Sequence, residues 1–330
     1  MVEDLNRYES IFKKELNRIE KVLAKLFSLE EPRSLYEPIN YVLRGGGKRI
    51  RPFLVLCSAS AVGGKYNSVY NASLAVEILH NFTLVHDDIM DKADTRRGRQ
   101  TVHIRNNVDA AILAGDLMAA LAYESLIKDC GNDAKMPLSV FTRGLIEVCE
   151  GQGYDKDFET RSSVSIKEYK LMIYKKTAAL IEMCCLLGAL LGKGTPNEVK
   201  ALGKYGRNLG MAFQIQDDLL DITADEKELG KPVGGDLAEG KKSYLFLKAL
   251  EKAKGREKEM LLKVIRNKGV KKNEIGIYRS LYEKLGVLED ARREIKAYTK
   301  KAVSSLEGIK RKKEIEILNW LALTLLQRNK

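Results

Sequence analysis

The sequence predicts an all-α protein built as one large helical bundle. Apolar residues recur three or four positions apart over long segments, which is the period of a helix with a buried face. Short glycine- or proline-containing stretches separate these segments, and alternating strand patterns are absent. The chain has 330 residues, of which 45% are hydrophobic, so it can bury a large core.

Six long helices and the breakers between them account for much of the chain. The predicted helices span residues 4–29, 69–91, 108–128, 167–192, 197–221 and 287–306. Turn-forming stretches include GGGKR at 45–49, DCGND at 129–133, GKGTP at 192–196 and GKPVGG at 230–235. No repeat of fixed length appears, which argues against a solenoid. We expect a single domain over residues 1–330, with about ten or more helices and a central set apolar nearly all round.

The N-terminal stretch MVEDLNRYES is polar, so no signal peptide is predicted. The longest apolar run, residues 178–191, contains Glu182 and is too short to span a bilayer, so no stable membrane insertion is expected. The five cysteines have neither metal-ligand nor disulfide-framework spacing, and we interpret them as buried thiols in a reducing compartment. These observations predict a cytoplasmic protein.

Positive charge is concentrated at the C-terminal end. Residues 241–330 contain 25 Lys and Arg against 11 Asp and Glu, although the whole chain carries a net charge of +12. Such a segment could bind nucleic acid or an anionic membrane surface. Both signs of charge are mixed there with apolar residues at helical spacing, and no recognition motif is present. We therefore expect a solvated helical surface and no nucleic-acid partner.

Two acidic motifs each end an apolar helix. LVHDDIMD places Asp87, Asp88 and Asp91 within five positions, and FQIQDDLLD repeats the same spacing at residues 217, 218 and 221. Residues four apart share a helical face, so the first and last aspartates of each motif lie one above the other. One such motif would suit an exposed helix end. A carboxylate at a helix C-terminus is unfavourable, so two copies call for another explanation.

Clustered carboxylates repel one another unless cations lie among them. Oxygen ligands without His or Cys suit Mg²⁺, which uses a few carboxylates and completes its coordination with water and phosphate oxygens. If the two motifs face each other, they would hold several Mg²⁺ ions, and these a polyphosphate.

Four groups of basic residues fit a phosphate-rich substrate. GGGKRIRP contains Lys48, Arg49 and Arg51 beside a flexible glycine run. TRRGRQT follows the first acidic motif, YKKTA begins an apolar helix, and GKPVGGDLAEGKKS follows the second motif. Any one group alone would be read as solvated surface. Together they predict direct Lys and Arg contacts with phosphate oxygens.

Two other motif readings fail. GDLAEGK at 235–241 approaches a phosphate-binding loop, but Lys242 replaces the required Ser or Thr and no strand precedes it. Glu77 and His80 have the spacing of a di-iron bundle ligand pair, yet no second Glu-x-x-His follows. His80 lies seven residues before Asp87, on nearly the same helical face, so it is expected to face a cavity.

The ordered motifs GGGKRIRP, DDIMD, RRG, GQ, KT, FQ, DDLLD and GKPVGGD resemble those of the trans-isoprenyl diphosphate synthases. The resemblance runs by motif from about Tyr36 to Lys242 and is similar in detail to the short-chain, geranylgeranyl type of archaeal-like sequences. It implies an isoprenoid synthase bundle with a deep central cavity. It also implies a magnesium-dependent prenyltransferase of isoprenoid biosynthesis, with three ions per active site, acting as a homodimer.

The resemblance implies a role for each matching residue. Metal positions are Asp87, Asp88, Asp91, Asp217, Asp218 and Asp221. Allylic diphosphate positions are Arg96, Lys176, Thr177, Gln214, Lys231 and Lys241, and isopentenyl diphosphate positions are Lys48, Arg51, His80 and Arg97. Among them, Asp87, Asp91, Asp217, Lys176, Lys231 and Arg96 are expected to be catalytic. Less direct matches are Gln152 in GQ and Arg328 in the terminal QRNK.

Product length is expected to depend on the turns before Asp87. In the family the residue five before the first aspartate, here Phe82, lies under the growing chain, and Thr83 is its neighbour. A plain core aromatic is the alternative interpretation of Phe82. Small Thr83 favours geranylgeranyl diphosphate (C20), with farnesyl diphosphate (C15) or a C15/C20 mixture as the alternative. A class I terpene cyclase or a non-catalytic synthase subunit fits less well, because both aspartate motifs and GGGKRIRP are intact.

Overall fold

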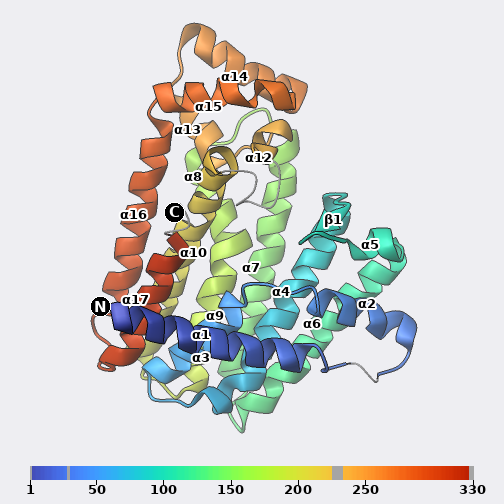
Figure 1. The fold of residues 1–330 in the computed structure, drawn as a ribbon, viewed down its shortest axis with the longest axis vertical. Helices are drawn as coiled ribbons and strands as arrows, with labels where there is room; N and C mark the ends of the chain where they lie inside the picture. Colours follow the sequence, from blue (N-terminus) through green and yellow to red (C-terminus); the bar gives the residue numbers. More distant parts are fainter. Residues whose placement is uncertain (1, 28–29, 225–232, 327–330) are drawn as a thin grey trace. The chain divides into compact units, whose positions relative to one another are not determined.

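A computed structural model describes residues 2–27, 30–224 and 233–326, and most of these residues are helical (Figure 1). The all-α prediction is confirmed. The chain divides into two compact units. The first comprises Met1–Phe141, Cys184–Leu202 and Ile309–Trp320, and the second comprises Thr142–Met183, Gly203–Gly308 and Leu321–Lys330. A single synthase domain and a central cavity stay predictions.

The N-terminal part of the first unit runs from α1 to α6. Its elements are α1 (Val2–Leu23), α2 (Arg33–Leu43), α3 (Ile50–Ala61), η1 (Tyr66–Val69), α4 (Tyr70–Met90), β1 (Thr95–Arg96), β2 (Arg99–Gln100), α5 (Val102–Arg105) and α6 (Val108–Cys130). Helix α1 ends six residues before the predicted boundary at 29, whereas α4 and α6 agree with prediction within two residues.

Helices α4 and α6 lie side by side (Figure 1). Small buried residues on α6, Ala111, Ala114 and Gly115, allow this close approach. A Cβ atom on Gly115 would lie 2.2 Å from Nε2 of His86, so α4 places an imidazole where α6 has no side chain. The helix that carries the first acidic motif is therefore packed tightly along its length.

A small hairpin between α4 and α5 is a departure from the sequence prediction. Strands β1 and β2 pair antiparallel, with Thr95 opposite Gln100 and Arg96 opposite Arg99. The two turn residues, Arg97 and Gly98, have φ of 53° and 71°. Two positive φ values in a two-residue loop are typical of the tight hairpin turn that matches strand twist. Strands of two residues are too short to show alternation, which is why the sequence did not reveal them.

Arg49 joins four helices of the first unit. This residue precedes α3, is 2% exposed and has φ of 44°. Its guanidinium donates to Glu77 on α4 at 2.5 Å, to Glu20 on α1 at 2.7 Å and to the carbonyl oxygen of Leu43, the last residue of α2, at 2.8 Å. Arg49, in the GGGKRIRP motif, is therefore a structural residue. Glu77 is engaged by Arg49, which excludes it from the di-iron role considered above.

The second unit contains most of the C-terminal elements. Its helices are α7 (Lys135–Thr160), α8 (Ile166–Ile173), η2 (Tyr174–Ala178), α9 (Ala179–Leu191), α10 (Pro196–Thr223), α12 (Gly235–Ala238), α13 (Tyr244–Lys252), α14 (Gly255–Asn267), η3 (Lys272–Glu274), α15 (Ile275–Lys284), α16 (Val287–Ser305) and α17 (Lys312–Leu326); parts of α7, α9, α10 and α17 belong to the first unit. Residues 167–192 are not one regular helix, because η2 is a π-helical turn between α8 and α9.

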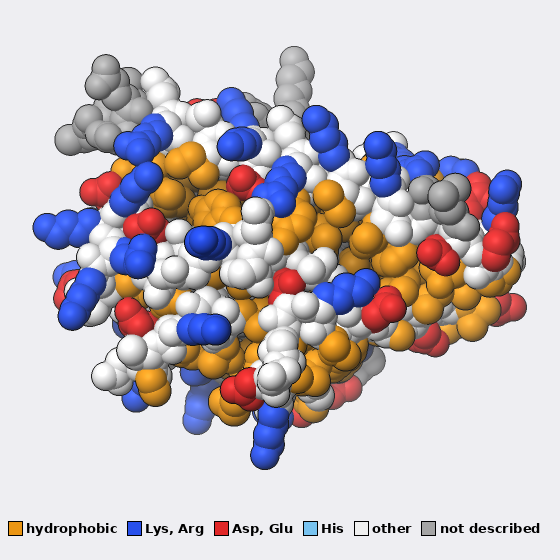
Figure 2. Space-filling view, turned by 90° about the horizontal axis from the view of Figure 1, so that it is seen from below, with side chains coloured by type: hydrophobic (Ala, Val, Ile, Leu, Met, Phe, Trp, Pro, Cys, Tyr) orange, Lys and Arg blue, Asp and Glu red, His pale blue; other side chains and the backbone are white. Residues whose placement is uncertain are grey.

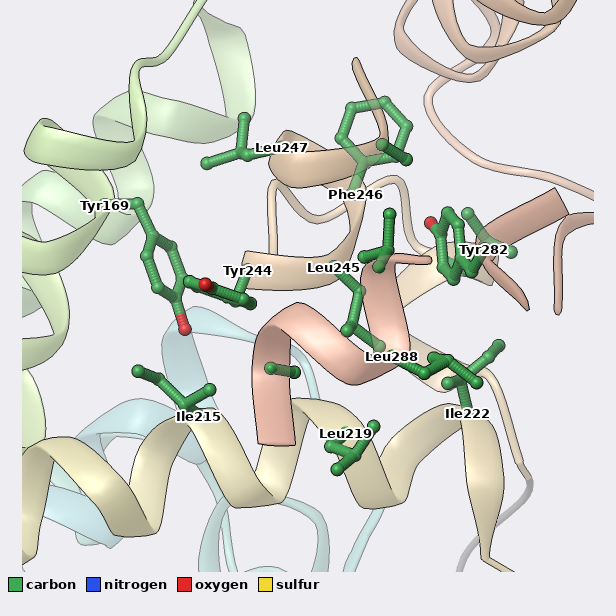
Figure 3. Packing of buried hydrophobic residues seen from close by; sticks show 14 of the residues in the cluster. Tyr169, Ile215, Leu219, Ile222, Tyr244, Leu245, Phe246, Leu247, Tyr282 and Leu288 are labelled. Carbon is green, nitrogen blue, oxygen red and sulfur yellow. The ribbon is translucent and has the colours of Figure 1, made fainter. Parts of the chain in front are cut away.

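The core of the second unit gathers side chains from α7, α8, α10 and α12 to α16, and Figure 3 shows part of it. Tyr169 of α8 and Tyr244 of α13 are each 1% exposed, with ring centroids 6.1 Å apart. Ile215 and Leu219 of α10 lie below them, and Leu288 of α16 closes the cluster. The second acidic motif lies on the same part of α10 as these core residues, so the core sets the orientation of the motif.

Four of the five cysteines are buried, as predicted. Cys149 is exposed on α7, so the prediction of five buried thiols is wrong there.

Helix α6 is long and apolar enough to cross a membrane by length and composition alone, and 39% of its most apolar window is buried. A core helix of a globular protein passes the same test, and α6 packs on α4.

Replacing Arg49 with Ala is expected to destabilise the protein by about 3–5 kcal/mol, because Glu77 would be left buried without its cation. Urea unfolding followed by circular dichroism measures the change. Arg33→Ala is the matched control, since its side chain is 87% exposed in a 3.3 Å pair with Glu31. Equal unfolding midpoints for the two variants would show that the Arg49 contacts do not hold the four helices.

Candidate active site

The first acidic motif ends helix α4. Asp87 and Asp88 lie in its last turn, and Asp91 is the C-cap, whose backbone N–H donates to the carbonyl oxygen of Asp87 at 2.8 Å. Asp87 is half-buried and Asp91 is exposed, whereas Asp88 is 5% exposed. The middle carboxylate therefore points into the protein, and the outer two lie closer to solvent.

Asp88 is bound by a residue of the hairpin. Nε of Arg96 donates to Oδ1 of Asp88 at 2.6 Å. Burial raises the pKa of Asp88, and the charge and hydrogen bond of Arg96 oppose that rise. The pair fixes strand β1 against the end of α4. Two residues predicted separately, one as a metal position and one as an allylic position, thus contact each other.

A cluster of cations surrounds His80 in the first unit. Nη1 of Arg51 lies 3.2 Å from Nε2 of His80, and Arg97 donates from Nη1 to the carbonyl oxygen of Gly46 in the glycine loop. Desolvation and the nearby charges, first of them Arg51, lower the pKa of His80 well below its usual value. His80 is therefore neutral and accepts from Arg51. Excess positive charge of this kind suits a diphosphate.

The glycine loop is shaped around the same cations. Gly46 and Gly47 have φ of 71° and 153°, and a Cβ on Gly47 would lie 3.2 Å from the Arg97 guanidinium. Lys48, next in the chain, is exposed. The predicted isopentenyl diphosphate residues are thus neighbours in one unit: Lys48, Arg51, His80 and Arg97.

The two product-length residues occupy different settings on α4. The ring of Phe82 packs edge-on against His86, with centroids 4.9 Å apart, and remains half-buried. Oγ1 of Thr83 donates to the carbonyl oxygen of His80 at 2.8 Å, so this side chain folds back on its own helix. Partial exposure of Phe82 distinguishes it from fully buried aromatics such as Phe53 and Phe141.

The second acidic motif also combines an exposed carboxylate with a buried middle one, but here the third aspartate is buried as well. Asp217 is exposed, whereas Asp218 and Asp221 are 6% and 3% exposed. Oδ2 of Asp218 accepts from the Tyr169 hydroxyl at 2.6 Å and from the Tyr244 backbone N–H at 2.7 Å. Burial raises the pKa of Asp218 to about 6, although these hydrogen bonds stabilise its charged form.

Asp221 is held by the backbone that follows the second motif. Its Oδ2 accepts from the N–H of Asp236 at 3.1 Å, and its carbonyl oxygen accepts from Gly234 at 2.6 Å. These contacts tie α10 to the start of helix α12.

Polar residues of the π-helical turn connect to the same motif. Oγ1 of Thr177 donates to Oε1 of Gln214 at 2.8 Å, and Nε2 of Gln214 donates to Oδ1 of Asp218 at 3.1 Å. Nζ of Lys176 lies 2.6 Å from Oδ2 of Asp155 on α7. The KT motif is therefore joined to the FQ and DDLLD motifs of α10, which lie far from it in the sequence, by a continuous set of hydrogen bonds.

These residues line a cavity of about 140 Å³ within the second unit. Lys176, Thr177, Gln214, Asp218 and Lys241 all contribute to its walls. Nζ of Lys241 lies 2.8 Å from Oε2 of Glu239. Burial lowers the pKa of Lys241, but the hydrogen bond to Glu239 and the charges of Glu239 and Asp236 outweigh burial, so the pKa is raised overall. Lys241 is thus positively charged at neutral pH.

Not every predicted or suspected residue can be assigned to this cavity. Lys231 and Arg328 lie outside the described residues. Lys242 is buried and donates to the carbonyl oxygen of Phe158 at 2.6 Å, so it has a structural role. Gln152 is 8% exposed, and neither atom of its amide has a hydrogen-bond partner in the part of the chain described.

Asp155 and Tyr169 are two residues of this site that sequence reasoning missed. Asp155 lies on the GQ helix three residues after Gln152, a spacing that places both on one side of α7 and could have indicated it. Tyr169 gave no sequence signal, because its role depends on a hydroxyl that reaches Asp218 across 49 positions of sequence.

The donor set fits Mg²⁺. Over residues 2–27, 30–224 and 233–326, no three His, Cys, Asp or Glu side chains converge as a preformed metal cage. Mg²⁺ does not require one, because it typically binds one or two carboxylates and keeps water or phosphate oxygens as its other ligands. Asp87 and Asp91 share one helical face, and Asp217 is exposed, so carboxylates of the right kind border solvent in each motif.

The basic C-terminal region is a mixed surface. Exposed pairs such as Lys284–Glu257 at 2.6 Å and Lys248–Glu251 at 2.8 Å alternate along its helices. These ion pairs support the prediction of a solvated helical surface. Figure 2 shows one face of the molecule, on which Lys and Arg side chains are mixed with acidic, polar and apolar ones.

Comparison with known proteins identifies the family. The model of the family described as polyprenyl synthetase matches residues 32–284. The geranylgeranyl diphosphate synthase of Sulfolobus acidocaldarius is 39% identical, with 99% of this chain and 100% of that protein covered. The short chain isoprenyl diphosphate synthase of Methanothermobacter thermautotrophicus is 40% identical, with 90% and 91% covered.

The fold agrees with the sequence comparison. The crystal structure of geranylgeranyl pyrophosphate synthetase from Pyrococcus horikoshii Ot3 superposes with a TM-score of 0.89 and 39% identity, with 98% of each chain covered. The resemblance noted in the motifs is thereby confirmed, as is the isoprenoid synthase type of helical bundle. Spanning its relatives almost completely and carrying both aspartate motifs, this chain belongs to the polyprenyl synthetase family.

Proposed function

We propose that this chain is a prenyltransferase that condenses isopentenyl diphosphate with allylic diphosphates (dimethylallyl, geranyl and farnesyl) to form geranylgeranyl diphosphate. One observation carries the proposal: each aspartate motif has its own set of cations, Arg96 with Asp88 and Lys176 with Lys241 near Asp218. Diphosphates are the substrates that need both carboxylate-held metal and direct cationic contacts. Relatives of about 40% identity carry the geranylgeranyl name.

Isopentenyl diphosphate is held by the cations around His80. Lys48, Arg51 and Arg97 supply the charge, and Arg51 can offer a planar pair of N–H donors to phosphate oxygens. Neutral His80 orients Arg51 without adding a further charge. The substrate is therefore bound electrostatically, while its hydrocarbon part needs no polar partner.

The allylic diphosphate is held by Arg96, Lys176, Lys231 and Lys241. Ionisation of the allylic carbon–oxygen bond builds negative charge on the departing diphosphate, and fixed cations stabilise that charge where it develops. Isopentenyl diphosphate then attacks the allyl cation, and a proton is lost, with the released diphosphate as the acceptor. Thr177 and Gln214 hold the π-helical turn to the second motif, so Lys176 is presented in a constant position.

Asp87, Asp91 and Asp217 are the proposed Mg²⁺ ligands, with three ions per active site. When bound, Mg²⁺ supplies positive charge that neutralises the departing diphosphate. Asp88, Asp218 and Asp221 are engaged by Arg96, Tyr169 and the Asp236 N–H, so their main role is to orient the motifs. This division refines the expectation that all six aspartates bind metal.

Farnesyl diphosphate, or a C15/C20 mixture, is the alternative product. The name short chain isoprenyl diphosphate synthase of two relatives leaves the length open. We favour C20 because Thr83 is small and is hydrogen-bonded back to its helix, which leaves room beside Phe82.

The active form is proposed to be a homodimer that pairs through helix α6. One face of α6 packs on α4, and the other leaves Val108, Ile112 and Leu113 from 41% to 58% exposed. Ile104 and Met90, each 44% exposed, extend this apolar surface. A second copy of the same chain would bury it by a symmetric, self-complementary contact.

Purified protein is expected to form C20 product from isopentenyl diphosphate and each allylic primer with Mg²⁺, and none with EDTA. Asp87→Ala and Asp217→Ala should each lower kcat by orders of magnitude, since several kcal/mol of charge stabilisation depends on the metal. Asp133→Ala, an exposed aspartate outside both motifs, is the control. Full activity in EDTA, or normal turnover in both motif variants, would refute the mechanism.

Product length is expected to change at two adjacent positions. Phe82→Ala should open space and shift products beyond C20, whereas Thr83→Phe should shorten them towards C15. Product chains are sized by chromatography under excess isopentenyl diphosphate. Phe12→Ala is the control, because Phe12 is also half-buried and packs on Phe53 at 5.0 Å. An active Phe82→Ala variant with wild-type products would show that Phe82 only packs in the core and does not limit product length.

Light scattering coupled to size exclusion should give twice the 37.1 kDa mass of one chain. Leu113→Lys should shift the protein to monomers, because it places charge in the proposed interface. Ile277→Lys on α15 is the matched control, since Ile277 is 56% exposed outside this surface. A dimer that persists in Leu113→Lys would argue against pairing through α6.

A further inference from the structure

The π-helical turn Tyr174–Ala178 lies between two glycines. A Cβ on Gly151 of α7 would lie 2.2 Å from the backbone nitrogen of Lys176, and one on Gly210 of α10 would lie 2.5 Å from Cα of Ala178. Real Cβ atoms essentially never approach within 3.0 Å. The backbones of α7 and α10 therefore contact the turn directly, one on each side, with no side chain between them.

Helix α7 also holds the turn through charge. Lys175 pairs with Glu147 and Glu150, and Lys176 pairs with Asp155 at 2.6 Å. All three acidic residues lie on α7 within two turns of Gly151. Backbone contact and ion pairs thus act on the same two lysines from one helix.

A π-helical turn needs such support. Its i→i+5 hydrogen bond, here from the N–H of Ala179 to the carbonyl oxygen of Tyr174, accommodates one residue more than an α-helical turn, and such turns are rare. Displacement of the turn would move Lys176 and Thr177 together. It would also disturb Gln214 and Asp218, because Thr177 reaches them through successive hydrogen bonds of 2.8 and 3.1 Å.

We propose that Gly151 is a positioning residue for the allylic diphosphate: its missing side chain lets α7 fix the π-helical turn that presents Lys176 and Thr177. Gly210 supports the same turn from α10. The inference rests on the proposed function, in which Lys176 and Thr177 serve the allylic substrate. Neither glycine contacts the substrate, and each acts through the backbone of the turn.

Gly151→Ala tests the inference, with Gly153→Ala as the matched control. Gly153 is exposed on the same helix, and a Cβ there would meet nothing within 4 Å. Both changes improve helix propensity equally, so that effect cancels. Gly151→Ala should raise KM for dimethylallyl diphosphate and lower its kcat/KM on the order of 100-fold, the cost of displacing a positioned group by about 1 Å. KM for isopentenyl diphosphate should stay within about twofold of wild type, and Gly153→Ala should match wild type throughout.

Comparing KM for the two substrates distinguishes a positioning effect from a loss of folded protein. Partial unfolding reduces active enzyme and lowers kcat without changing either KM, so equal KM values in Gly151→Ala and wild type would overturn the inference. So would equal losses for both substrates. If Gly151→Ala does not fold by circular dichroism, Gly210→Ala decides by the same measurements.

The wild type distinguishes this inference from the proposed function. Wild-type and Gly153→Ala proteins that fold but form no product would sink the function itself. An active wild type with a Gly151→Ala variant of unchanged allylic constants would sink only the role of Gly151.

Discussion

The electrostatic cost of placing carboxylates at the ends of buried helices constrains the whole structure. In each motif the middle aspartate points inward, where a charge without partners is unfavourable. The protein meets this cost with donors from distant elements: a hairpin arginine for Asp88, and a tyrosine hydroxyl with a helix N-terminal N–H for Asp218. These contacts hold the hairpin against α4, and α8 and α13 against α10, while the first aspartate of each motif stays nearer to solvent.

Much of the fold follows from sequence periodicity because its helices are long and amphipathic. The bounds of α4, α6 and α10 agree with prediction within two residues, and both aspartate motifs end helices as expected. Other features have no periodic signal. The β1–β2 hairpin is two residues per strand, and the π-helical turn leaves the apolar pattern of residues 167–192 uninterrupted, so neither could be read from spacing.

Site residues were predictable by type and motif, but their partners were not. Lys48, Arg49 and Arg51 look alike in sequence, yet Arg49 is buried among Glu20, Glu77 and Leu43, and Arg51 contacts His80. Only packing separates a cation that stabilises the fold from one available to a diphosphate. Likewise, Lys241 and Lys242 are adjacent, but Lys242 is buried and donates to the carbonyl oxygen of Phe158. Adjacent residues on a chain face different environments, and composition alone does not show which environment each residue has.

The extra residue in η2 also affects which changes in chain length the protein can tolerate. Removing one residue from a regular helix rotates everything beyond it by about 100° and exposes its buried face. Within Tyr174–Ala178, the same deletion would convert the wide turn to an ordinary α-helical one and leave α8 and α9 in their present orientations. A homologue one residue shorter at this point would thus keep its core intact while losing the local geometry, so alignments should be read for single-residue gaps there.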